Sequence, residues 1–585
     1  MYNEEMASTL FDLLRRGSEY YGDKNLFKFN RSHETVEISY TEFKDYVYKL
    51  TLAFTHLNLK DKRVVLIGET SVQWIATYIA TITCGGVIVP LDPSLLEEEV
   101  IKFVNLSDST VVVCSTSFEE LFKNHEDEIP DVRHIVVMDK NTFTLTTDKM
   151  FEYKKFSEFN NILALGEFLS TNSELAIAED RDTTKMSALL FTSGTTGTSK
   201  GVMLSEKNIC TVINGIRPTL YQLSTKDVLL SVLPVYHTYE MSCGILAPMI
   251  FGCSICISDG IKYVGKNIKQ FQPTIMTLVP LFVNQLYKNI MKSVKKEGKE
   301  KALKFGIKLT RALRVLKIDV RKKVFASVRE GLGGRIKWFI AGGAALDPAM
   351  VKAFDNFGIH ICQGYGITEC APLISVVRMD EYNPTSCGRP VCYMEVRIDK
   401  ENPEDDFGEI VVKGDNVMLG YYNDPEQTAE VLDEEGWFRT GDYGYVDEKG
   451  FIYITGRKKN VIVLEGGKNV FPEEIEEYLG GISLIEECVV VGKKEDETTN
   501  IVALVYPNAE ECEKAGLSDK EAICKAINDE VTKINKKLAS YKHISRIEIM
   551  DEPFEKTTTQ KIKRHKIEKK DAPAEKAEPE VSSEQ

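Results

Sequence analysis

Over its first four-fifths the chain alternates short apolar runs, rich in β-branched residues, with segments of helical periodicity. RVVLIG (63–68) has the pattern of a buried strand, SVQWIATYIATITC that of a helix, and GVIVPLD that of a second strand. Further strand-like runs follow at intervals filled by helical patterns: VVVC, HIVVM, SALLFT, VLLSVLP, SICIS, TIMTLVP and IKWFIAGG. This alternation predicts α/β layers built on largely parallel sheets.

Composition narrows the function classes. The chain has 585 residues, 43% of them hydrophobic, which is enough for several buried cores. Its net charge of −15 argues against nucleic acid as a partner, because binding phosphates needs a basic face. Thirteen cysteines without a regular spacing indicate reduced thiols and a cytoplasmic protein. In the CxxC pair Cys253 and Cys256, strand spacing would point the thiols to opposite faces, so no redox or metal role is expected.

Two uncharged stretches, Thr70–Leu91 and Met241–Ser258, are long enough to test as membrane spans. Both contain glycines and one proline each. Each is therefore predicted to be a buried helix followed by a buried strand. The N-terminal residues include acids and no apolar core of a signal peptide.

The pattern changes near residue 456, which divides the chain into a large N-terminal domain (1–455) and a small C-terminal α/β domain (456–570). In the second domain, TGRKKNVIVLEGGKNVFPEEIEEYL predicts a turn, a strand, a turn and a helix with Pro472 at its first position. The tail, 571–585, has two prolines, five acids and no aromatic residue, and is predicted to be disordered.

A basic helical segment (284–335) stands out in this acidic chain. From residue 288 to 330 there are fifteen Lys or Arg against four acids, and apolar residues recur at near-helical spacing: Leu303, Ile307, Leu309, Leu313 and Leu316. One interpretation is a solvated helical pair that covers the core. The other is a surface for anionic membranes or acidic groups, which would place the protein peripherally at the inner face of a membrane.

The strongest local motif is TSGTTGTSKG (192–201), directly after the strand-like SALLF. Backbone N–H groups and hydroxyls in such a loop can hold phosphates, and Lys200 adds a positive charge. The loop is not a Walker A motif, since Ser199 precedes the lysine and Gly201 follows it.

This loop resembles the phosphate loop of the adenylate-forming (AMP-binding) superfamily, which includes acyl-CoA synthetases and luciferases. The other motifs of the superfamily occur in order: PVYHTYE (234–240), AGGAALD (341–347), QGYGITE (363–369), CGRP (387–390), WFRTGD (437–442), GRKKN (456–460), EGGKNVFPEEIE (465–476) and KTTTQKIKR (556–564). The resemblance spans nearly the whole chain. It implies the luciferase-like α/β fold, with a large multi-lobed N-terminal domain and a small mobile C-terminal domain.

The resemblance also implies the site residues for ATP and Mg²⁺. A phosphate loop would hold the β- and γ-phosphates with Thr192, Ser193, Gly194, Thr195, Thr196, Gly197, Thr198 and Lys200. Glu369 would ligate Mg²⁺ and Thr368 would contact the α-phosphate. The adenine would lie between Tyr365 and the segment Gly343, Ala344 and Ala345, and the ribose would be held by Asp442 and Arg457. His237 stands where the family keeps a residue near the substrate carboxylate, although a buried structural histidine is the alternative.

For the C-terminal domain, the resemblance assigns catalysis to Lys561, whose charge would offset that of the carboxylate and α-phosphate. The family usually has Gly before this lysine, whereas Gln560 stands here, so Lys563 is the fallback. Lys459 would be the hinge about which the small domain turns between adenylation and thioester formation. Gly466 and Gly467 would line the path of the CoA pantetheine.

The long basic segment before LGGRIKWFIAGGAAL resembles the long-chain fatty acyl-CoA synthetase branch. The resemblance thus implies an ATP- and Mg²⁺-dependent long-chain fatty acid:CoA ligase that acts through an acyl-adenylate. Two alternatives stay open: delivery of the acyl group to a carrier protein or another acceptor, for which the basic segment could dock an acidic carrier, and a non-enzymatic nucleotide-binding lipid chaperone or scaffold.

Overall fold

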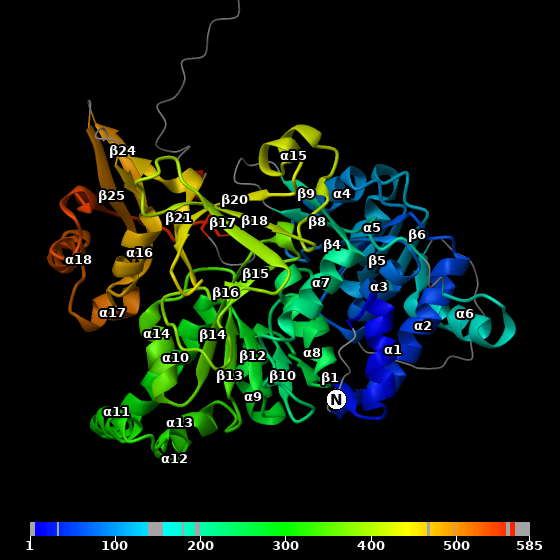
Figure 1. The fold of residues 1–585 in the computed structure, drawn as a ribbon, viewed down its shortest axis with the longest axis horizontal. Coiled ribbons are helices and arrows are strands. Elements are labelled where there is room, and N and C mark those ends of the chain that lie inside the picture. The colour runs from blue at the N-terminus through cyan, green and yellow to red at the C-terminus, as the bar shows by residue number, and fades with distance from the viewer. Residues whose placement is uncertain are drawn as a thin grey trace, which may run out of the picture. The chain divides into compact units, whose positions relative to one another are not determined.

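The computed structural model describes residues 6–31, 34–138, 156–177, 181–192, 199–464, 468–495, 498–556, 562–564 and 566–567. The chain forms two compact units (Figure 1). The N-terminal unit holds the described residues up to Thr192 and those of Lys200–Ile454, and the C-terminal unit holds those from Thr455 onward. The predicted elements in 193–198, 465–467, 557–561 and 571–585 lie outside the described residues.

A nine-stranded sheet in the N-terminal unit runs in the order β16-β15-β14-β13-β12-β10-β11-β1-β2. Its strands are β1 (Asn25–Arg31), β2 (Glu34–Ser39), β10 (Val228–Ser231), β11 (Ser254–Ile257), β12 (Ile275–Leu278), β13 (Trp338–Ala341), β14 (His360–Gly366), β15 (Leu373–Val376) and β16 (Arg389–Pro390). The strands from β1 through β14 pair in parallel, and the two edges pair antiparallel.

An eight-stranded sheet has the order β19-β9-β8-β4-β3-β5-β6-β7. Its strands are β3 (Arg63–Ile67), β4 (Val87–Leu91), β5 (Val111–Ser115), β6 (His134–Met138), β7 (Phe156–Glu158), β8 (Met186–Thr192), β9 (Lys200–Ser205) and β19 (Gly420–Tyr421). Pairing is parallel from β8 to β7 and antiparallel from β8 to β19. Every apolar run that the sequence predicts as a strand is one, so the prediction of parallel α/β sheets is confirmed.

Helices cover these sheets, as Figure 1 shows. They are α1 (Leu10–Tyr21), α2 (Tyr40–His56), α3 (Val72–Thr83), α4 (Glu97–Leu106), α5 (Glu119–Asn124), α6 (Phe159–Asn172), α7 (Glu206–Ile216), a π-helix (Tyr239–Leu246), α8 (Ala247–Ile250), α9 (Val264–Phe271), α10 (Pro280–Lys296), α11 (Glu300–Val315), α12 (Arg321–Val324), α13 (Ala326–Gly331), α14 (Pro348–Asn356) and α15 (Pro425–Val431). Many begin at a polar cap: the side chain of Ser71 accepts from the backbone N–H of Trp74 at the start of α3, for example.

Both uncharged stretches form a buried helix followed by a buried strand, as predicted. Among the residues that the structure describes, no helix is both long and apolar enough to span a bilayer. All thirteen cysteines are free thiols. Cys253 and Cys256 pack in different apolar clusters, which confirms that they point to opposite faces of the nine-stranded sheet.

The main apolar core takes side chains from both large sheets and from α2, α3 and α7, with Trp74 and Phe43 fully buried in it.

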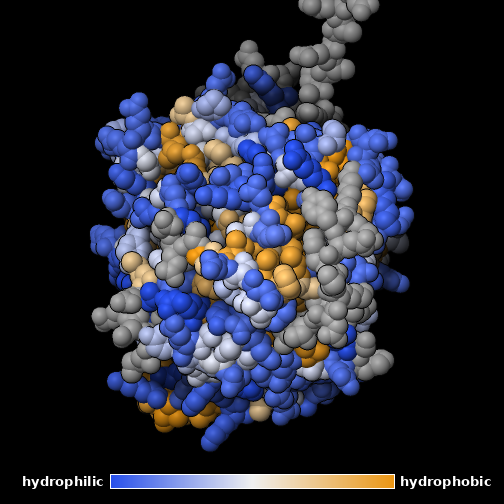
Figure 2. Space-filling model, turned by 90° about the vertical axis from the view of Figure 1, so that its right-hand side faces the viewer, coloured by the Kyte–Doolittle hydropathy of each residue, from blue (hydrophilic) through white to orange (hydrophobic). Residues whose placement is uncertain are grey.

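The surface on one side of the molecule is mostly polar, in contrast to this core (Figure 2). Figure 2 shows the side on which α6 lies in Figure 1; it is mostly hydrophilic, with hydrophobic side chains gathered near its middle.

An antiparallel sheet contains β17 (Met394–Asp399), β18 (Gly408–Gly414), β20 (Phe438–Val446) and β21 (Ile452–Arg457), in that order, and the N-terminal unit ends within β21, at Ile454. The C-terminal unit contains β22 (Ile462–Val463), β23 (Asn469–Val470), α16 (Pro472–Gly480), β24 (Ile485–Glu495), β25 (Thr498–Pro507), α17 (Ala509–Lys514), α18 (Lys520–Asn535) and β26 (Arg546–Ile549). Pro472 is the first residue of α16, as predicted.

Candidate active site

The candidate site in the N-terminal unit forms where parallel strands end. β13 and β14 are neighbours, with Ala341 opposite Gln363 at their carboxyl ends. The AGGAALD loop follows β13, and QGYGITE runs through the end of β14 into a turn at Thr368–Cys370. Open parallel sheets commonly bind ligands at the carboxyl ends of their strands. The fold therefore brings both motifs to a place suited to a nucleotide.

Glycine suits the first two positions of the loop after β13. A Cβ on Gly342 would lie 3.3 Å from Cζ of Tyr239 and 3.4 Å from the carbonyl oxygen of Gly364. Gly343 has φ of +84°, a left-handed conformation that costs other residues energy. Gly343, Ala344 and Ala345 are exposed. The loop therefore exposes its backbone without bulky side chains, so that a planar ring such as adenine could pack against it.

Tyr365 and Asp442, both predicted to hold the adenosine, are in direct contact. The Tyr365 hydroxyl, on β14, donates to Oδ2 of Asp442, on β20, at 2.7 Å. Both residues are buried, with 6% and 3% of their surface exposed. The backbone N–H of Asp442 donates to Oγ1 of Thr440 at 3.1 Å. A buried hydrogen bond of this kind fixes the orientation of both side chains.

Glu369 and Lys200 are linked through a residue that the sequence did not single out, Tyr421 on β19. The Tyr421 hydroxyl donates to Oε1 of Glu369 at 3.0 Å, and Nζ of Lys200 lies 4.6 Å from the centroid of the Tyr421 ring. Burial and the nearby Glu369 carboxylate raise the pKa of Tyr421, so the phenol keeps its proton and donates. Thr368 lies beside Glu369, half-buried in the same turn.

The surroundings of Glu369 suit a magnesium ion that is held mainly by phosphates. Among the described residues no three acidic, histidine or cysteine side chains form a cluster that could hold a metal ion alone. Mg²⁺ in nucleotide-binding enzymes commonly takes one or two carboxylates together with phosphate oxygens and water. The half-buried carboxylate of Glu369, oriented by Tyr421, fits that pattern.

An apolar cavity of about 60 Å³ adjoins Tyr365. Its lining comes from α7, the π-helix and the ends of β13–β15, and includes Ile216, Tyr239, Cys243, Leu373 and Val376. His237 is not part of this lining. It lies just before the π-helix, half-buried, with its ring 4.3 Å from that of Tyr236.

Glu240 on the π-helix is a buried acid that the sequence did not reveal. Its carboxylate accepts from Oγ of Ser231 on β10 at 2.5 Å and from Oγ1 of Thr277 on β12 at 2.6 Å. Burial raises the pKa of Glu240 to about 7. The side chain thus joins the π-helix, and with it the cavity lining from Tyr239 and Cys243, to two central strands.

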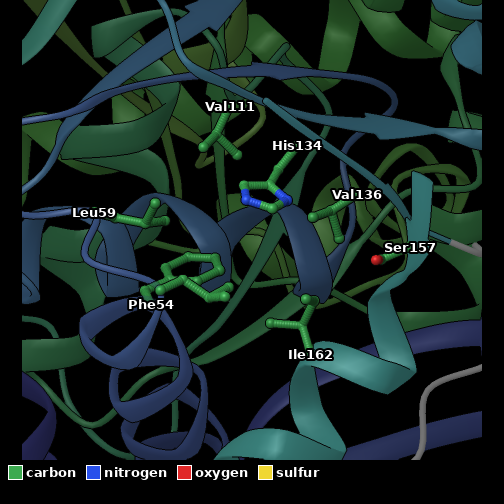
Figure 3. A pocket seen from close by; sticks show the side chains of 8 residues that line it. Phe54, Leu59, Val111, His134, Val136, Ser157 and Ile162 are labelled. Atoms are coloured by element: carbon green, nitrogen blue, oxygen red, sulfur yellow. The ribbon is translucent and has the colours of Figure 1, made fainter. Parts of the chain in front are cut away.

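A second cavity, among α2, β5, β6 and α6, measures only about 10 Å³ (Figure 3). It is lined by Phe54, Leu57, Leu59, Val111, His134, Val136, Ser157 and Ile162. That volume is near the lower limit for one water molecule, so this cavity is a packing defect and not a ligand site.

In the phosphate loop, the structure fixes both ends. Thr192 ends β8 opposite Lys200, which begins β9, and Oγ1 of Thr192 donates to the Lys200 carbonyl at 3.5 Å. The predicted residues between them, Ser193, Gly194, Thr195, Thr196, Gly197 and Thr198, lie outside the described residues, as do Gly466, Gly467 and Lys561.

The C-terminal unit contains Arg457, at the end of β21, and Lys459, in the exposed turn that follows. The two flanks of Lys561 are described. Lys556 pairs with Ile562 in an antiparallel bridge and forms an ion pair with Glu487, while Arg564 forms one with Glu476 on α16. Both ends of the KTTTQKIKR motif are therefore anchored to the unit.

Comparisons with known proteins identify the family of the chain. The family model described as AMP-binding enzyme matches residues 14–422, and that of the AMP-binding enzyme C-terminal domain matches 459–573. Long-chain-fatty-acid–CoA ligase 5 of Rattus norvegicus is 27% identical over 95% of this chain and 85% of its own length. The chloroplastic long-chain-fatty-acid–[acyl-carrier-protein] ligase AEE15 of Arabidopsis thaliana is 26% identical over 95% and 84%.

Among solved structures, that of the anthranilate CoA ligase AuaEII in complex with anthranoyl-AMP has a TM-score of 0.75 at 20% identity, over 97% of this chain and 98% of that one. This likeness confirms the predicted fold, a large N-terminal α/β domain with a small C-terminal domain.

Proposed function

Because the chain belongs to the family of AMP-binding enzymes, we propose that it is an ATP- and Mg²⁺-dependent long-chain fatty acid:CoA ligase. At the coarser level, it is an adenylate-forming, acyl-activating enzyme. In the proposed reaction a carboxylate oxygen attacks the α-phosphorus of ATP and releases pyrophosphate. The thiol of CoA then attacks the acyl carbon, which releases AMP and gives acyl-CoA.

The observation that carries the proposal is the position of Tyr365 on β14 and of Glu369 in the turn just after it, each held by a hydrogen bond from another sheet: Tyr365 to Asp442 on β20, and Tyr421 on β19 to Glu369. We assign the adenine to the space between Tyr365 and the loop Gly343, Ala344 and Ala345, and the ribose to Asp442 and Arg457. The β- and γ-phosphates are assigned to 192–198 with Lys200. Thr368 contacts the α-phosphate in this scheme.

Glu369 holds Mg²⁺, which when bound neutralises phosphate charge in the transition state. Lys561 adds positive charge beside the reacting carboxylate during adenylation. In our proposal, residues 456–570 form the mobile domain that carries Lys561, with Lys459 as its hinge and Gly466 and Gly467 along the CoA path. Residues 1–455 bind nucleotide and acid. His237 acts near the substrate carboxylate.

The choice of a long-chain acid rests on the named relatives. The cavity beside Tyr365 is apolar, so it suits an apolar group of the acid, and each methylene buried there contributes about 0.8 kcal/mol. Relatives at about 27% identity are named for long-chain fatty acids. The alternative acceptor is a carrier protein, which the name of a second relative specifies. For location, we propose the cytoplasm, because the chain is rich in free thiols.

The first experiment incubates the purified protein with ATP, Mg²⁺ and fatty acids of about eight to twenty carbons, with CoA, with an acyl carrier protein, or with neither. Mass spectrometry follows AMP, acyl-AMP and the thioester. We expect acyl-CoA to form only when CoA is present, and fastest with the longer acids. A thioester formed only on the carrier would establish the alternative, and no AMP with any acid would contradict both.

The role of Lys561 is tested by separating the two half-reactions. Lys561→Ala should stop adenylation, by about 100-fold or more, while thioester formation from supplied acyl-AMP continues. Lys563→Ala is the matched control, with a lysine removed two residues away, and should keep both half-reactions. If Lys563→Ala loses adenylation and Lys561→Ala does not, the role belongs to Lys563.

A further inference from the structure

The basic segment 288–330 contains two kinds of cation that behave differently in the structure. Its arginine side chains form ion pairs and hydrogen bonds with other residues of the protein, whereas most of its lysine side chains are exposed at the surface. In Figure 1, α11, α12 and α13 lie at one edge of the N-terminal unit, beyond α10 and α14.

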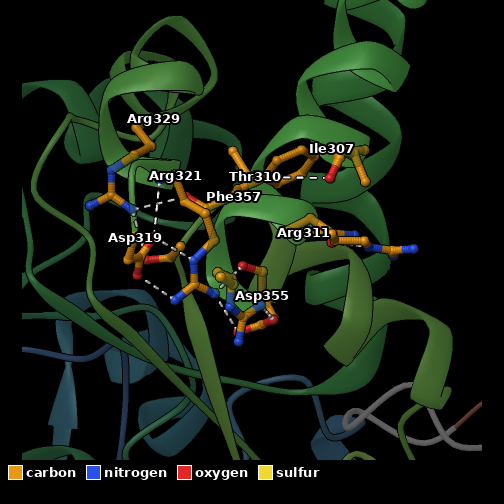
Figure 4. Close-up of polar contacts among 11 residues, drawn as sticks. Ile307, Thr310, Arg311, Asp319, Arg321, Arg329, Asp355 and Phe357 are labelled. Atoms are coloured by element: carbon orange, nitrogen blue, oxygen red, sulfur yellow. Dashed lines mark hydrogen bonds and ion pairs between the residues drawn. The ribbon is translucent and has the colours of Figure 1, made fainter. Parts of the chain in front are cut away.

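The arginines fasten α11 and α12 to α14 and to the chain that follows it (Figure 4). Arg314 and Arg321 share Asp355, with N–O distances of 2.7 and 2.6 Å, and Arg311 donates to Oδ1 of Asn356. Arg329 is buried and donates to backbone carbonyls at Ile336 and Gly358. The charges of these arginines are therefore used in contacts within the protein.

The lysines of α11 make no such contacts among the described residues. Lys301, Lys304 and Lys308 are exposed, and within the described chain they make no ion pair or side-chain hydrogen bond. An unpaired lysine in the middle of an acidic protein adds nothing to the fold through its charge, and it remains available to an anionic partner.

The apolar residues of α11, which the sequence shows at near-helical spacing, divide into two faces in the structure. Leu303 and Ile307 pack on the core, whereas Leu309 and Leu316 are exposed. The exposed face continues at intervals of three and four residues, which places its members on one side of the helix. We call it the apolar stripe: Ala302, Phe305, Leu309, Ala312 and Leu316.

The apolar stripe is unusually exposed for its composition. Phe305 is 67% exposed and Leu316 68%, and Val315 beside the stripe is 83% exposed. From Ala302 to Leu316 the stripe is about 21 Å long, at 1.5 Å per residue. Lys301 and Lys308 stand four residues before Phe305 and Ala312, so they flank the stripe on the helix surface.

From this arrangement we propose that α11 binds the surface of a membrane containing anionic lipids. The stripe enters the boundary between headgroups and acyl chains, and the flanking lysines meet the lipid phosphates. A second copy of the chain is a poor occupant, because pairing two stripes would bring their lysines together. An acidic protein would match the lysines but leaves the length of exposed apolar surface unexplained. The inference rests on this surface alone and not on the proposed reaction.

The test is sedimentation of the full chain with vesicles of phosphatidylcholine containing about 30% phosphatidylglycerol. The wild type should bind at 50 mM salt, bind at least tenfold more weakly at 500 mM, and fail to bind vesicles of phosphatidylcholine alone. The triple variant Lys301→Gln, Lys304→Gln, Lys308→Gln should lose about 100-fold in affinity, since each lysine near an anionic surface contributes a factor of about five. Phe305→Ser should lose about tenfold.

Matched controls separate the stripe from charge and hydrophobicity in general. Phe168→Ser removes a phenylalanine of α6 that is 62% exposed but adjoins Glu167, and it should bind as the wild type does. The triple change Lys525→Gln, Lys536→Gln, Lys537→Gln removes three exposed lysines from the C-terminal unit and should also have no effect. Equal losses in the stripe and control variants would contradict the proposal.

A measurement on the wild type alone gives an independent check. Hydrogen exchange of the amides of 300–316 should slow when the anionic vesicles are added, while that of α6 stays unchanged. If the wild type remains in solution with these vesicles at 50 mM salt, or if an acidic carrier protein protects 300–316 and the vesicles do not, the proposal is wrong.

Discussion

The candidate site and helix α11 use polar side chains in opposite ways. In the candidate site, two of the residues that we assign to the reaction are held by a neighbour: Tyr365 by Asp442, and Glu369 by Tyr421. On α11, Lys304 and Phe305 project from the surface and have no such partner among the described residues. A group that is held by its neighbours can be part of precise chemistry, and its removal should be costly. A group that is not held can be changed without cost to the fold, so any effect of the change reports on a partner outside the chain.

The largest effect is expected at Glu369. Glu369→Gln removes the carboxylate charge that we assign to Mg²⁺ and keeps the shape, so it should lower the adenylation rate by about 100- to 1,000-fold and raise the Mg²⁺ concentration that gives half the maximal rate. The measurement is pyrophosphate release at a series of Mg²⁺ concentrations. Glu448→Gln, a change at an exposed glutamate, is the control. A normal rate in Glu369→Gln would remove this residue from the site.

A smaller effect should follow from loosening the Tyr365–Asp442 pair. Tyr365→Phe keeps the ring and removes the hydroxyl, so Asp442 loses the bond that orients it. Since a hydrogen bond to a charged group contributes about 1.5–3 kcal/mol, KM for ATP should rise about tenfold while kcat changes less. Tyr443→Phe breaks a similar bond, from the next residue on β20 to Glu401, and should leave KM unchanged. Equal KM values in both variants would contradict the assignment.

Much of this site could be predicted from the sequence, because its motifs are local and follow apolar strands. Glu369 in QGYGITE and Asp442 in WFRTGD could be assigned from their local motifs, without knowing which strands pair in the sheets. Tyr421 was missed because its relation to Glu369 and Lys200 exists only once β19 pairs with β9, and that register cannot be seen in a short edge strand. The two faces of α11 were missed for a related reason: apolar residues at near-helical spacing do not say which of them the protein will cover.

Glu240 illustrates the same limit inside the core. The run YHTYEMSCG suggests a buried helix, but the π-helix and its bonds to Ser231 and Thr277 depend on strands that lie elsewhere in the sequence. No cation is among the groups that set its pKa, and Tyr239 and Cys243, the titratable neighbours, have pKa values raised by burial and stay neutral. Among the residues that the structure describes, the carboxyl of Glu240 is therefore paired only with the hydroxyls of Ser231 and Thr277.

This pairing predicts a pH effect on stability. The folded-state pKa of about 7 lies above the ordinary value of 4.5, so the protonated carboxyl contributes stability that is fully present below pH 4.5 and is lost as the pH rises through 7. Glu240→Gln stays neutral at every pH. Relative to this variant, the wild type should lose about 2–3 kcal/mol between pH 5 and pH 8. Thermal unfolding of both proteins across this range measures it, and a constant difference would contradict the prediction.

The smallest effect on stability is expected from a change on α11, and a small effect would show that the side chain is not part of the core. Phe305→Ser should change the free energy of unfolding by no more than about 0.5 kcal/mol, because a side chain that is 67% exposed has few contacts to lose. Phe354→Ala on α14, where the ring is fully buried against Phe339 and Phe357, should cost about 3–5 kcal/mol. Urea unfolding followed by circular dichroism compares the two. If Phe305→Ser is as costly as Phe354→Ala, the stripe is part of the core in solution and is not available to a membrane. If Phe305→Ser leaves the stability unchanged, folding does not explain why a phenylalanine stands among lysines at this position. A partner that binds both the aromatic ring and the lysine charges would explain it.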